Sequence, residues 1–270
     1  MSLAEDPGFG SLLQRLEGRG LPPLQAYKER CLRRRLAVRM RACGVKTFAE
    51  YADVLDLRPG EVDQLLQALT INVTGFFRNP ETWARLAAAL PDLLAGGSDV
   101  VRAWSAGCAS GEEAWTTAIL LSTAVERTAP GRVAVGVDAT DVDEVVLKEA
   151  RAGEYDPDAF REMPAEPFRR WTEPAGSRVR VRDDLRGMVR FLRHDLAQGL
   201  APDPPYDLVV CRNVLIYFEK SIQQDLFLRF ADALRPGGLL LLGKVETLHG
   251  PARERLETID TRERIFRRPA

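Results

Sequence analysis

Short apolar runs and segments of helical periodicity alternate along most of the chain. Four runs have the length and composition of buried strands: Val100–Trp104, Arg132–Val137, Tyr206–Cys211 and Leu239–Leu242. Glu113–Arg127 and Glu219–Leu234 place apolar side chains on one face of a helix, and Arg235–Gly238 is expected to close the second helix. Because strands and helices alternate, the pattern predicts an α/β fold with a mostly parallel sheet.

The first 70 residues show helical patterns only. The predicted helices cover Gly8–Gly20, Leu24–Cys43, Phe48–Leu55 and Pro59–Leu69. In the second helix Leu24, Cys31 and Val38 recur every seven residues, with Tyr27 between them, and we expect this apolar stripe to face the core. We therefore predict a helical domain over residues 1–70, a linker and connecting helix over 71–98, and an α/β domain over 99–270.

An insert interrupts the strand and helix rhythm between Gly153 and Leu196. Asp158–Trp171 has a helical pattern broken at Pro164, and Arg178–Arg182 and Met188–Leu192 alternate as strands do. The two alternating segments predict a small antiparallel insert over about 155–193. The chain end, about residues 255–267, could supply a final strand pair.

The segment Val100–Glu113 contains the strongest chemical signal. An apolar run passes through Gly107 and Gly111 to Glu112, where a helix is expected to begin. In an open α/β sheet a ligand binds at this place, beyond the carboxyl end of the strand. A phosphate would meet the Glu112–Glu113 carboxylates there, so the pattern favours a positively charged cofactor. An ordinary capped helix is the alternative.

Acidic residues follow the second predicted strand. Asp138, Asp141 and Asp143 cluster at its carboxyl end, where an acid can accept hydrogen bonds from ribose hydroxyls. Asp141 or Asp138 could do so, and Asp141 or Asp143 could cap the next helix.

The linker Leu69–Trp83 interleaves polar and aromatic side chains. Asn72, Thr74 and Arg78 lie among apolar neighbours, and Pro80 suits the first position of a helix. This segment could pin the helical domain to the sheet, or its donors could enter a ligand site.

One basic segment departs from the overall charge balance. The formal net charge is −1, yet Lys28–Arg41 holds seven basic residues against one acid, Glu29. Arg30, Arg34 and Arg41 line one flank of the predicted helix. A solvated face is one interpretation, and a surface for nucleic acid or an acidic protein is the other.

Composition excludes several classes of protein. The four cysteines form no C-x-x-C pair and the two histidines are far apart, so we expect reduced thiols and no metal. No apolar run approaches the length of a membrane span, and the first residues lack the layout of a secretory signal. We expect a cytoplasmic protein.

Four segments resemble the CheR-type chemotaxis receptor methyltransferases in sequence, order and spacing. They are L-T-I-N-V-T-G-F-F-R-N, W-S-A-G-C-A-S-G-E-E, A-T-D-V-D-x-x-V-L-x-x-A-R-x-G-x-Y and C-R-N-V-L-I-Y-F. The resemblance implies a Rossmann-like class I methyltransferase sheet, an N-terminal all-helical domain and a small antiparallel β insert. It also implies transfer of a methyl group from S-adenosylmethionine to glutamate side chains of chemoreceptors, by a protein that we expect to be monomeric and to bind no nucleic acid.

The resemblance also implies the functional residues. Arg78 and Tyr217 match positions beside the transferred methyl group, and Arg30, Arg34 and Arg41 are our candidates for binding the acidic receptor helix. The cofactor-binding positions that it implies are Asn72, Thr74, Arg78, Glu113, Asp141, Asp195, Leu196, Arg212 and Asn213.

The chain departs from the family pattern at four places. Asp195-Leu196 stands where Asn-Leu is usual, which alters the expected adenine contact because Asp cannot donate as an amide does. Ala114-Trp115 replaces Pro-Tyr, a change that we expect to affect packing. The insert turn at Glu173–Arg178 is short, which disfavours docking of a receptor tether peptide. Val245-Glu246-Thr247 retains only the acid of the usual Ser-Glu-Asn.

The sequence suggests two alternative functions. Asp203-Pro204-Pro205-Tyr206 spells the D-P-P-Y motif of amino-methyltransferases, but it precedes a predicted strand, whereas the motif must follow one to lie near the cofactor. A module that binds the cofactor without turnover is the second alternative, and the presence of both Arg78 and Tyr217 disfavours it.

Overall fold

The computed structural model describes residues 8–17, 19, 21–70, 72–95, 98–128, 130–131 and 133–270. These residues divide into two compact units. The first contains the described residues through Thr70 together with Tyr217–Ile222, and the second contains Asn72–Ile216 and Gln223–Ala270.

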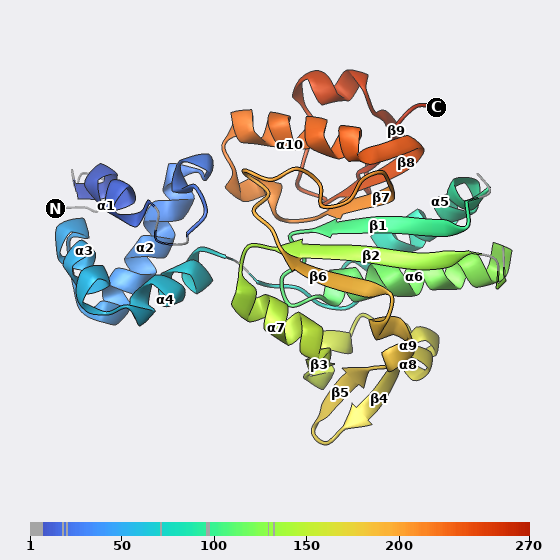
Figure 1. The fold of residues 1–270 in the computed structure, drawn as a ribbon, viewed down its shortest axis with the longest axis horizontal. Coiled ribbons are helices and arrows are strands. Elements are labelled where there is room, and N and C mark those ends of the chain that lie inside the picture. Colours follow the sequence, from blue (N-terminus) through green and yellow to red (C-terminus); the bar gives the residue numbers. More distant parts are fainter. Residues whose placement is uncertain are drawn as a thin grey trace. The chain divides into compact units, whose positions relative to one another are not determined.

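Helices make up the first unit (Figure 1). They are α1 (Gly8–Leu16), the 3-10 turn η1 (Leu24–Ala26), α2 (Glu29–Cys43), α3 (Phe48–Leu57) and α4 (Gly60–Leu69). The later segment joins this unit through backbone bonds, since the Lys28 N–H donates to the Tyr217 carbonyl and the Glu219 N–H to the Ala26 carbonyl, both at 2.8 Å.

The prediction for the second helix was wrong at the start of the helix and in its buried face. Tyr27 has an extended backbone and Lys28 a non-helical ψ of 124°, so η1 and α2 are separate elements. The seven-residue repeat from Leu24 crosses this break and therefore has no helical meaning. Within α2 the buried side chains are Leu32, Leu36 and Met40, whereas Val38 is 41% exposed.

The second unit is built on a seven-stranded sheet with the order β6-β2-β1-β7-β8-β10-β9. The strands are β1 (Val100–Ala106), β2 (Ala134–Asp141), β6 (Val189–Arg193), β7 (Tyr206–Cys211), β8 (Leu234–Leu242), β9 (Glu257–Asp260) and β10 (Ile265–Arg267). Strands β6, β2, β1, β7 and β8 are parallel, and β10 is antiparallel to both of its neighbours. This order and direction form the Rossmann-like class I methyltransferase sheet that we predicted.

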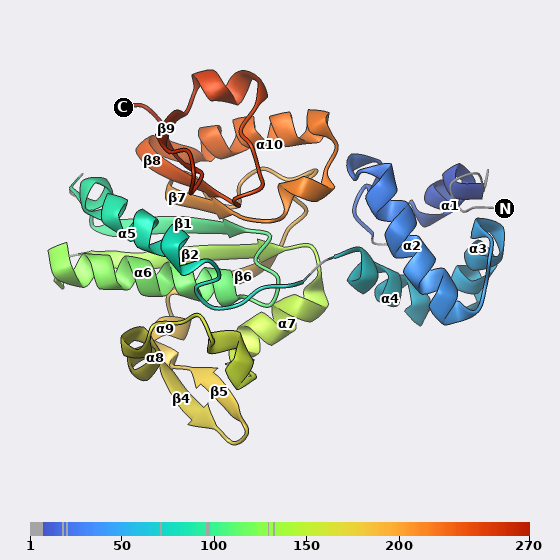
Figure 2. The same ribbon diagram turned by 180° about the vertical axis from the view of Figure 1, so that it is seen from behind.

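Helices cover the sheet. They are α5 (Pro80–Leu94), α6 (Glu112–Thr128), α7 (Glu144–Ala152) and α10 (Lys220–Ala233), and α5 and α6 lie against one face (Figure 2). Strand β8 begins directly after α10, so the predicted break at Arg235–Gly238 lies inside the strand. A register shift between Tyr206 and Leu208 of β7 accommodates this irregular start.

A small antiparallel sheet of order β3-β5-β4 follows α7. The insert contains β3 (Glu154–Tyr155), η2 (Pro157–Phe160), α8 (Ala165–Trp171), β4 (Thr172–Ala175), β5 (Arg178–Val181) and α9 (Asp183–Arg186). The prediction that Met188–Leu192 belongs to this insert was wrong, because β6 pairs in parallel with β2. Alternation also suits the edge of a main sheet, where one side is covered and the other meets water.

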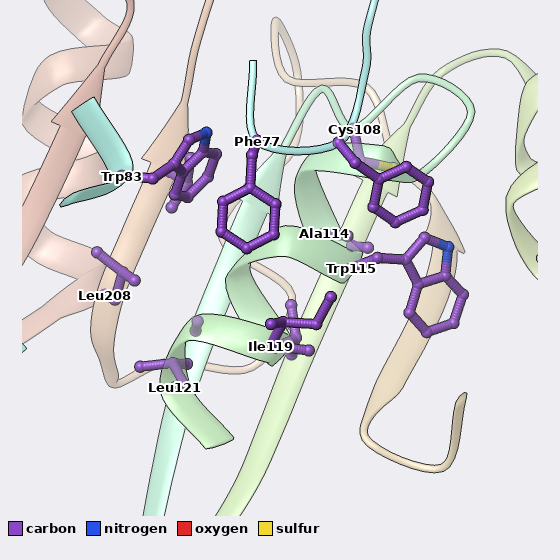
Figure 3. Packing of buried hydrophobic residues seen from close by; sticks show 14 of the residues in the cluster. Phe77, Trp83, Cys108, Ala114, Trp115, Ile119, Leu121 and Leu208 are labelled. Carbon is purple, nitrogen blue, oxygen red and sulfur yellow. The ribbon is translucent and has the colours of Figure 1, made fainter. Parts of the chain in front are cut away.

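Large side chains of α5 and α6 form the core beside the sheet (Figure 3). Trp83 and Trp115 are each 1% exposed, and Leu208 of β7 is fully buried with them. The Trp115 ring packs 5.1 Å from the Phe191 ring, and its Nε1 donates to the Tyr155 hydroxyl at 2.8 Å. Trp115, which stands where the family usually has tyrosine, therefore contributes to the packing of the core.

Candidate cofactor site at the carboxyl ends of the strands

The strand order reverses between β1 and β7. Successive connections from β1 run outward through β2 to β6, and those from β7 run through β8 in the other direction. A crevice for a ligand forms at such a switch point, outside the carboxyl ends of the strands. The residues after Ala106 and Cys211 therefore define the candidate site.

The turn after β1 requires its two glycines. Gly107 and Gly111 have φ angles of 82° and 98°, and the N–H groups of Gly107 and Cys108 donate to the Thr140 carbonyl at 2.8 and 2.9 Å. A Cβ at Gly107 would lie 2.5 Å from Val214 Cγ2, and glycine alone avoids both the close approach and the backbone strain. This turn is thus tied to β2 and packed against the segment after β7.

Asp141 lies at the end of β2 and holds two loops. Its carboxylate accepts the Ala109 N–H at 2.9 Å and the Asp143 N–H at 3.0 Å, one on each oxygen. Burial raises the pKa of this carboxyl. Each oxygen keeps a further lone pair for another donor.

The two neighbouring acids have other partners. Asp143 is fully buried and caps α7 by accepting the Val145 N–H at 2.9 Å, as one of the two capping alternatives predicted. Asp138 accepts the Tyr206 hydroxyl at 2.7 Å and Arg190 Nε at 2.8 Å. Of the three acids, Asp141 has the surroundings that suit a ribose ligand best.

The linker from Asn72 onward belongs to the second unit and packs against the rest of it. Asn72 Nδ2 lies 3.4 Å from Asp143 Oδ2, and Thr74 is half-buried. The Phe76 N–H donates to the Ala159 carbonyl and the Phe77 N–H to Thr116 Oγ1, both at 3.0 Å. These bonds place the linker against η2 and the amino-terminal part of α6.

Arg78 stands at the end of this linker. Its guanidinium donates to the Val73 carbonyl at 2.7 Å, which uses one of its five N–H groups. The Arg78 carbonyl accepts Trp83 Nε1 and Arg212 Nη2, each at 3.0 Å. Its backbone is therefore fixed while its half-buried guanidinium has donors left.

Glu113 and Arg212 form a buried pair. Their closest atoms are 3.9 Å apart, and Ser105 Oγ donates to the Glu113 carboxylate at 3.1 Å. Burial raises the pKa of Glu113 to about 7, although Arg212 and Ser105 oppose the shift. Burial also lowers the pKa of Arg212. Arg212 lies over the Trp83 ring, and its Nε has no partner among the residues that the structure describes.

Asp195 and Leu196 follow β6. The Asp195 carboxylate accepts the Ala197 N–H at 2.9 Å, and burial raises its pKa. Leu196 is 6% exposed and its carbonyl accepts Arg229 Nη1 at 3.1 Å. Asp195 thus organises its own loop, and one carboxylate oxygen remains outside this bond.

The loop after β7 depends on a residue that the sequence reasoning did not select. Asn213 has a φ of 63°, and its N–H donates to Glu246 at 3.1 Å. Glu246 also accepts the N–H groups of Gly243, Val214 and Leu215. The retained acid in Val245-Glu246-Thr247 was the available signal, but three of its four partners lie 31 to 33 positions earlier in the chain.

The remaining predicted residues belong to the first unit. Arg30, Arg34 and Arg41 are exposed on α2, whereas Arg39 forms a bidentate pair with the buried Glu61 at 2.7 and 2.8 Å. Tyr217 ends the 3-10 turn η3 (Leu215–Tyr217). The roles of these residues toward the second unit stay predictions.

The D-P-P-Y segment lies at the amino end of its strand. Tyr206 is the first residue of β7, and Asp203 pairs with Arg102 at 2.5 Å. The motif is therefore at the opposite end of β7 from the candidate site, as its position in the sequence predicted.

Metal-ligand clusters and membrane-spanning helices are both absent from the described part of the chain. Within the described part of the chain, His, Cys, Asp and Glu form no group of three or more that could hold a metal ion. No helix among the described residues has the length and apolar character needed to cross a membrane.

Comparison with known proteins identifies the family. The model of the CheR methyltransferase SAM binding domain matches residues 72–265, and that of the CheR methyltransferase all-alpha domain matches residues 23–70. The chain is 34% identical over 238 residues to a chemotaxis protein methyltransferase of Listeria innocua, covering 88% of each chain. It is also 34% identical to the Escherichia coli protein of that name, over 89% of this chain and 84% of the other. A Pseudomonas aeruginosa relative, chemotaxis protein methyltransferase 1, is 34% identical over 84% of this chain and 85% of its own. The chain is thus a SAM-dependent methyltransferase and belongs to the CheR methyltransferase family.

Proposed function

We propose that this enzyme transfers the methyl group of S-adenosylmethionine to glutamate side chains of chemoreceptor proteins, with glutamyl methyl ester and S-adenosylhomocysteine as products. The observation that carries the proposal is the match of both family models, in order, along residues 23–70 and 72–265. Relatives named chemotaxis protein methyltransferase cover most of the chain and support the same substrate class.

The residues at the switch point fit a cationic cofactor. Gly107 and Gly111 let the turn after β1 pack closely against its neighbours, and the carboxylates of Glu112 and Glu113 stand where a phosphate would be repelled. When bound, S-adenosylmethionine supplies an electrophilic methyl group on a positively charged sulfur. Burial of Glu113 in a region of low polarity strengthens its attraction for a cation whenever it is ionised.

The proposed binding roles follow from the donors and acceptors of each residue. Asp141 accepts ribose hydroxyls, Asp195 and Leu196 border the adenine, and Glu113 with Arg212 frames the amino-acid end. Asn72, Thr74 and Arg78 approach from the linker, and Asn213 approaches from the loop after β7. The placement of the residues other than those of the linker after the adjoining strands β6, β2, β1 and β7 supports this division of the site.

The acceptor needs orientation more than activation. A glutamate carboxylate is already ionised at neutral pH, so no general base is required. Arg78 and Tyr217 hold it in line with the methyl group, and such placement can supply up to about 7–11 kcal/mol of the barrier. A strong Arg78 ion pair would weaken the nucleophile, so Tyr217 carries more of the catalytic role.

The partner is an acidic receptor helix. Arg30, Arg34 and Arg41 present an exposed basic stripe that complements such a helix. We further propose that the protein acts as a cytoplasmic monomer, binds no nucleic acid and uses no metal.

The decisive experiment incubates the protein with receptor-containing membranes and methyl-labelled S-adenosylmethionine. We expect label in the receptor band, and mild base should release it as methanol because carboxyl esters are labile. Membranes that lack receptors provide the control. Label that survives base would indicate N-methylation and would refute the proposal.

A further inference from the structure

Glu246 is a buried carboxylate that holds backbone instead of a cation. It is 3% exposed, and its oxygens accept four backbone N–H groups: Val214 at 2.9 Å and Leu215 at 2.8 Å on one oxygen, Asn213 at 3.1 Å and Gly243 at 2.7 Å on the other. Charge-assisted bonds of this kind are about twice as strong as neutral ones.

These bonds join two loops at the carboxyl edge of the sheet. Gly243 directly follows β8, and residues 213–215 directly follow Arg212 at the end of β7. A Cβ at Gly243 would lie 2.8 Å from both the Asn213 nitrogen and Glu246 Oε2, so this position has no room for a side chain. The two loops are therefore set against each other with little freedom.

Three positions connect the loop held by Glu246 to the candidate site. Asn213 is in the left-handed region, with a φ of 63°, which asparagine adopts more readily than other residues with a side chain. Val214 packs against Gly107 in the turn after β1. Two residues beyond the last bonded N–H lies Tyr217, which the proposed function places at the acceptor.

We propose that Glu246 is a positioning residue for methyl transfer, which acts by fixing residues 213–215 and, through them, Tyr217. This inference rests on the proposed function. It predicts that the charge and both oxygens of Glu246 are needed, because each oxygen holds two N–H groups.

The Glu246→Gln variant tests this requirement. Glutamine has one acceptor oxygen, and its NH2 would face two backbone N–H donors in either orientation. We expect kcat to fall about 10- to 100-fold, the effect of a small misplacement of reacting groups. Hydrogen exchange of the amides at 213–215 and 243 should become faster in the cofactor-free protein, which gives a readout independent of activity.

Glu263→Gln is the matched control. Glu263 is also buried, at 6% exposure, in the same unit, but its partners are Thr82, Lys244 and Arg262, all of which lie outside the loop after β7. Its kcat should change by less than about threefold, because the four N–H bonds to Glu246 remain in this variant. Equal loss in both variants would overturn the inference.

A double-mutant cycle separates positioning from general stability. If Glu246 acts through Tyr217, then Tyr217→Phe should cost little in kcat once Glu246→Gln is present, whereas Glu263→Gln and Tyr217→Phe should be additive. Additive loss in the first pair would refute the proposal.

If Glu246→Gln does not fold, Gly243→Ala can replace it, because the added methyl group disturbs the same bonds while the charge of Glu246 is retained. Gly136→Ala is the control for Gly243→Ala, because a Cβ at position 136 has open space around it. Normal kcat in Gly243→Ala would then refute the proposal. Should the wild type fail to methylate receptors, the proposed function would fall, while the amide exchange would still report whether Glu246 fixes the loop.

Discussion

The Asp141 carboxylate and the Ala109 N–H lie 2.9 Å apart and connect the end of β2 to the turn after β1. Ala109 has a φ of 47°, so this bond holds a strained residue next to the two glycines of the turn. Asp141 accordingly shapes the turn in addition to its proposed contact with the ribose.

We predict that Asp141→Asn weakens cofactor binding without unfolding the protein. Loss of hydrogen bonds to a charged acceptor costs about 1.5–3 kcal/mol, which corresponds to roughly a ten- to hundredfold rise in Kd. Asp138→Asn is the control, because its partners Tyr206 and Arg190 lie away from the carboxyl ends of their strands. Calorimetric titration in which Asp138→Asn is the weaker binder would move the ribose role to Asp138.

The raised pKa of Glu113 predicts a pH-dependent affinity. Its carboxyl has a pKa of about 7 because of burial, so it loses its charge as the pH falls through about 7. The affinity for the cationic cofactor should then decrease by up to about tenfold per pH unit below this value. Glu113→Gln should bind weakly at pH 8 and show a flatter profile, and calorimetry between pH 5.5 and 8.5 would measure both.

The raised pKa of Glu113 makes the stability of the protein change with pH in the opposite direction to the cofactor affinity. A carboxyl whose pKa is higher in the folded state than in the unfolded state binds more protons when folded, so its contribution to stability falls as the pH rises to about 7. Glu113→Gln should remove this loss. Urea unfolding of the cofactor-free protein at pH 6 and pH 8 would detect the change, and an identical pH dependence in both proteins would contradict the assignment.

Tyr217→Phe should lower kcat and leave the cofactor Kd nearly unchanged. The hydroxyl is assigned to the acceptor carboxylate, whereas Arg78 is proposed to border both ligands, so Arg78→Lys should alter both quantities. Steady-state kinetics at saturating cofactor, together with calorimetry, separate the two effects. A wild-type rate in the Tyr217→Phe enzyme would show that the hydroxyl has no such role.

Much of this site could be predicted because its signals are local. The strand, the glycine turn and the helix start are contiguous between Val100 and Glu113, and Asp141 stands at a strand end. Glu246 could not be assigned because three of its four donors, Asn213, Val214 and Leu215, come from positions distant in sequence. The buried face of α2 was missed because the repeat from Leu24 to Val38 spans the break at Tyr27 and Lys28. Strand β6 was misplaced because alternation does not reveal which sheet a strand joins.

The exposed stripe of α2 should determine receptor recognition. We predict that changing Arg30, Arg34 and Arg41 together to glutamate abolishes receptor methylation and leaves cofactor Kd unaltered. Reversal of the exposed Arg58, Arg127 and Arg253 changes the net charge equally and serves as the control. Raising the salt concentration should weaken the wild type, since exposed charges are screened beyond roughly 10 Å at 0.1 M. Equal methylation by both triple variants would exclude the stripe.

Recognition through α2 gains importance because the insert offers little to an added peptide strand. Strand β4 is an edge of the small sheet, and the Arg182 N–H donates to the Trp171 carbonyl. In an antiparallel pair, bonded residues alternate with unbonded ones, so the backbone groups of Thr172 and Pro174 point away from β5. The Thr172 N–H already donates to the Phe168 carbonyl, and proline has no N–H.

The outer edge of β4 therefore lacks the donors that a peptide needs in order to pair as a further strand. In addition, the Thr172 carbonyl, which points away from β5, already accepts a hydrogen bond from Arg182 Nε at 3.1 Å. We predict that a receptor with its C-terminal tether peptide deleted is methylated at nearly the same rate as the intact receptor. The isolated peptide should show no heat of binding to the wild type at about 100 μM, whereas a Pro174→Val variant, which restores one outward donor, should bind it more tightly. Tight binding to the wild type would show that the peptide docks by side chains or at another edge.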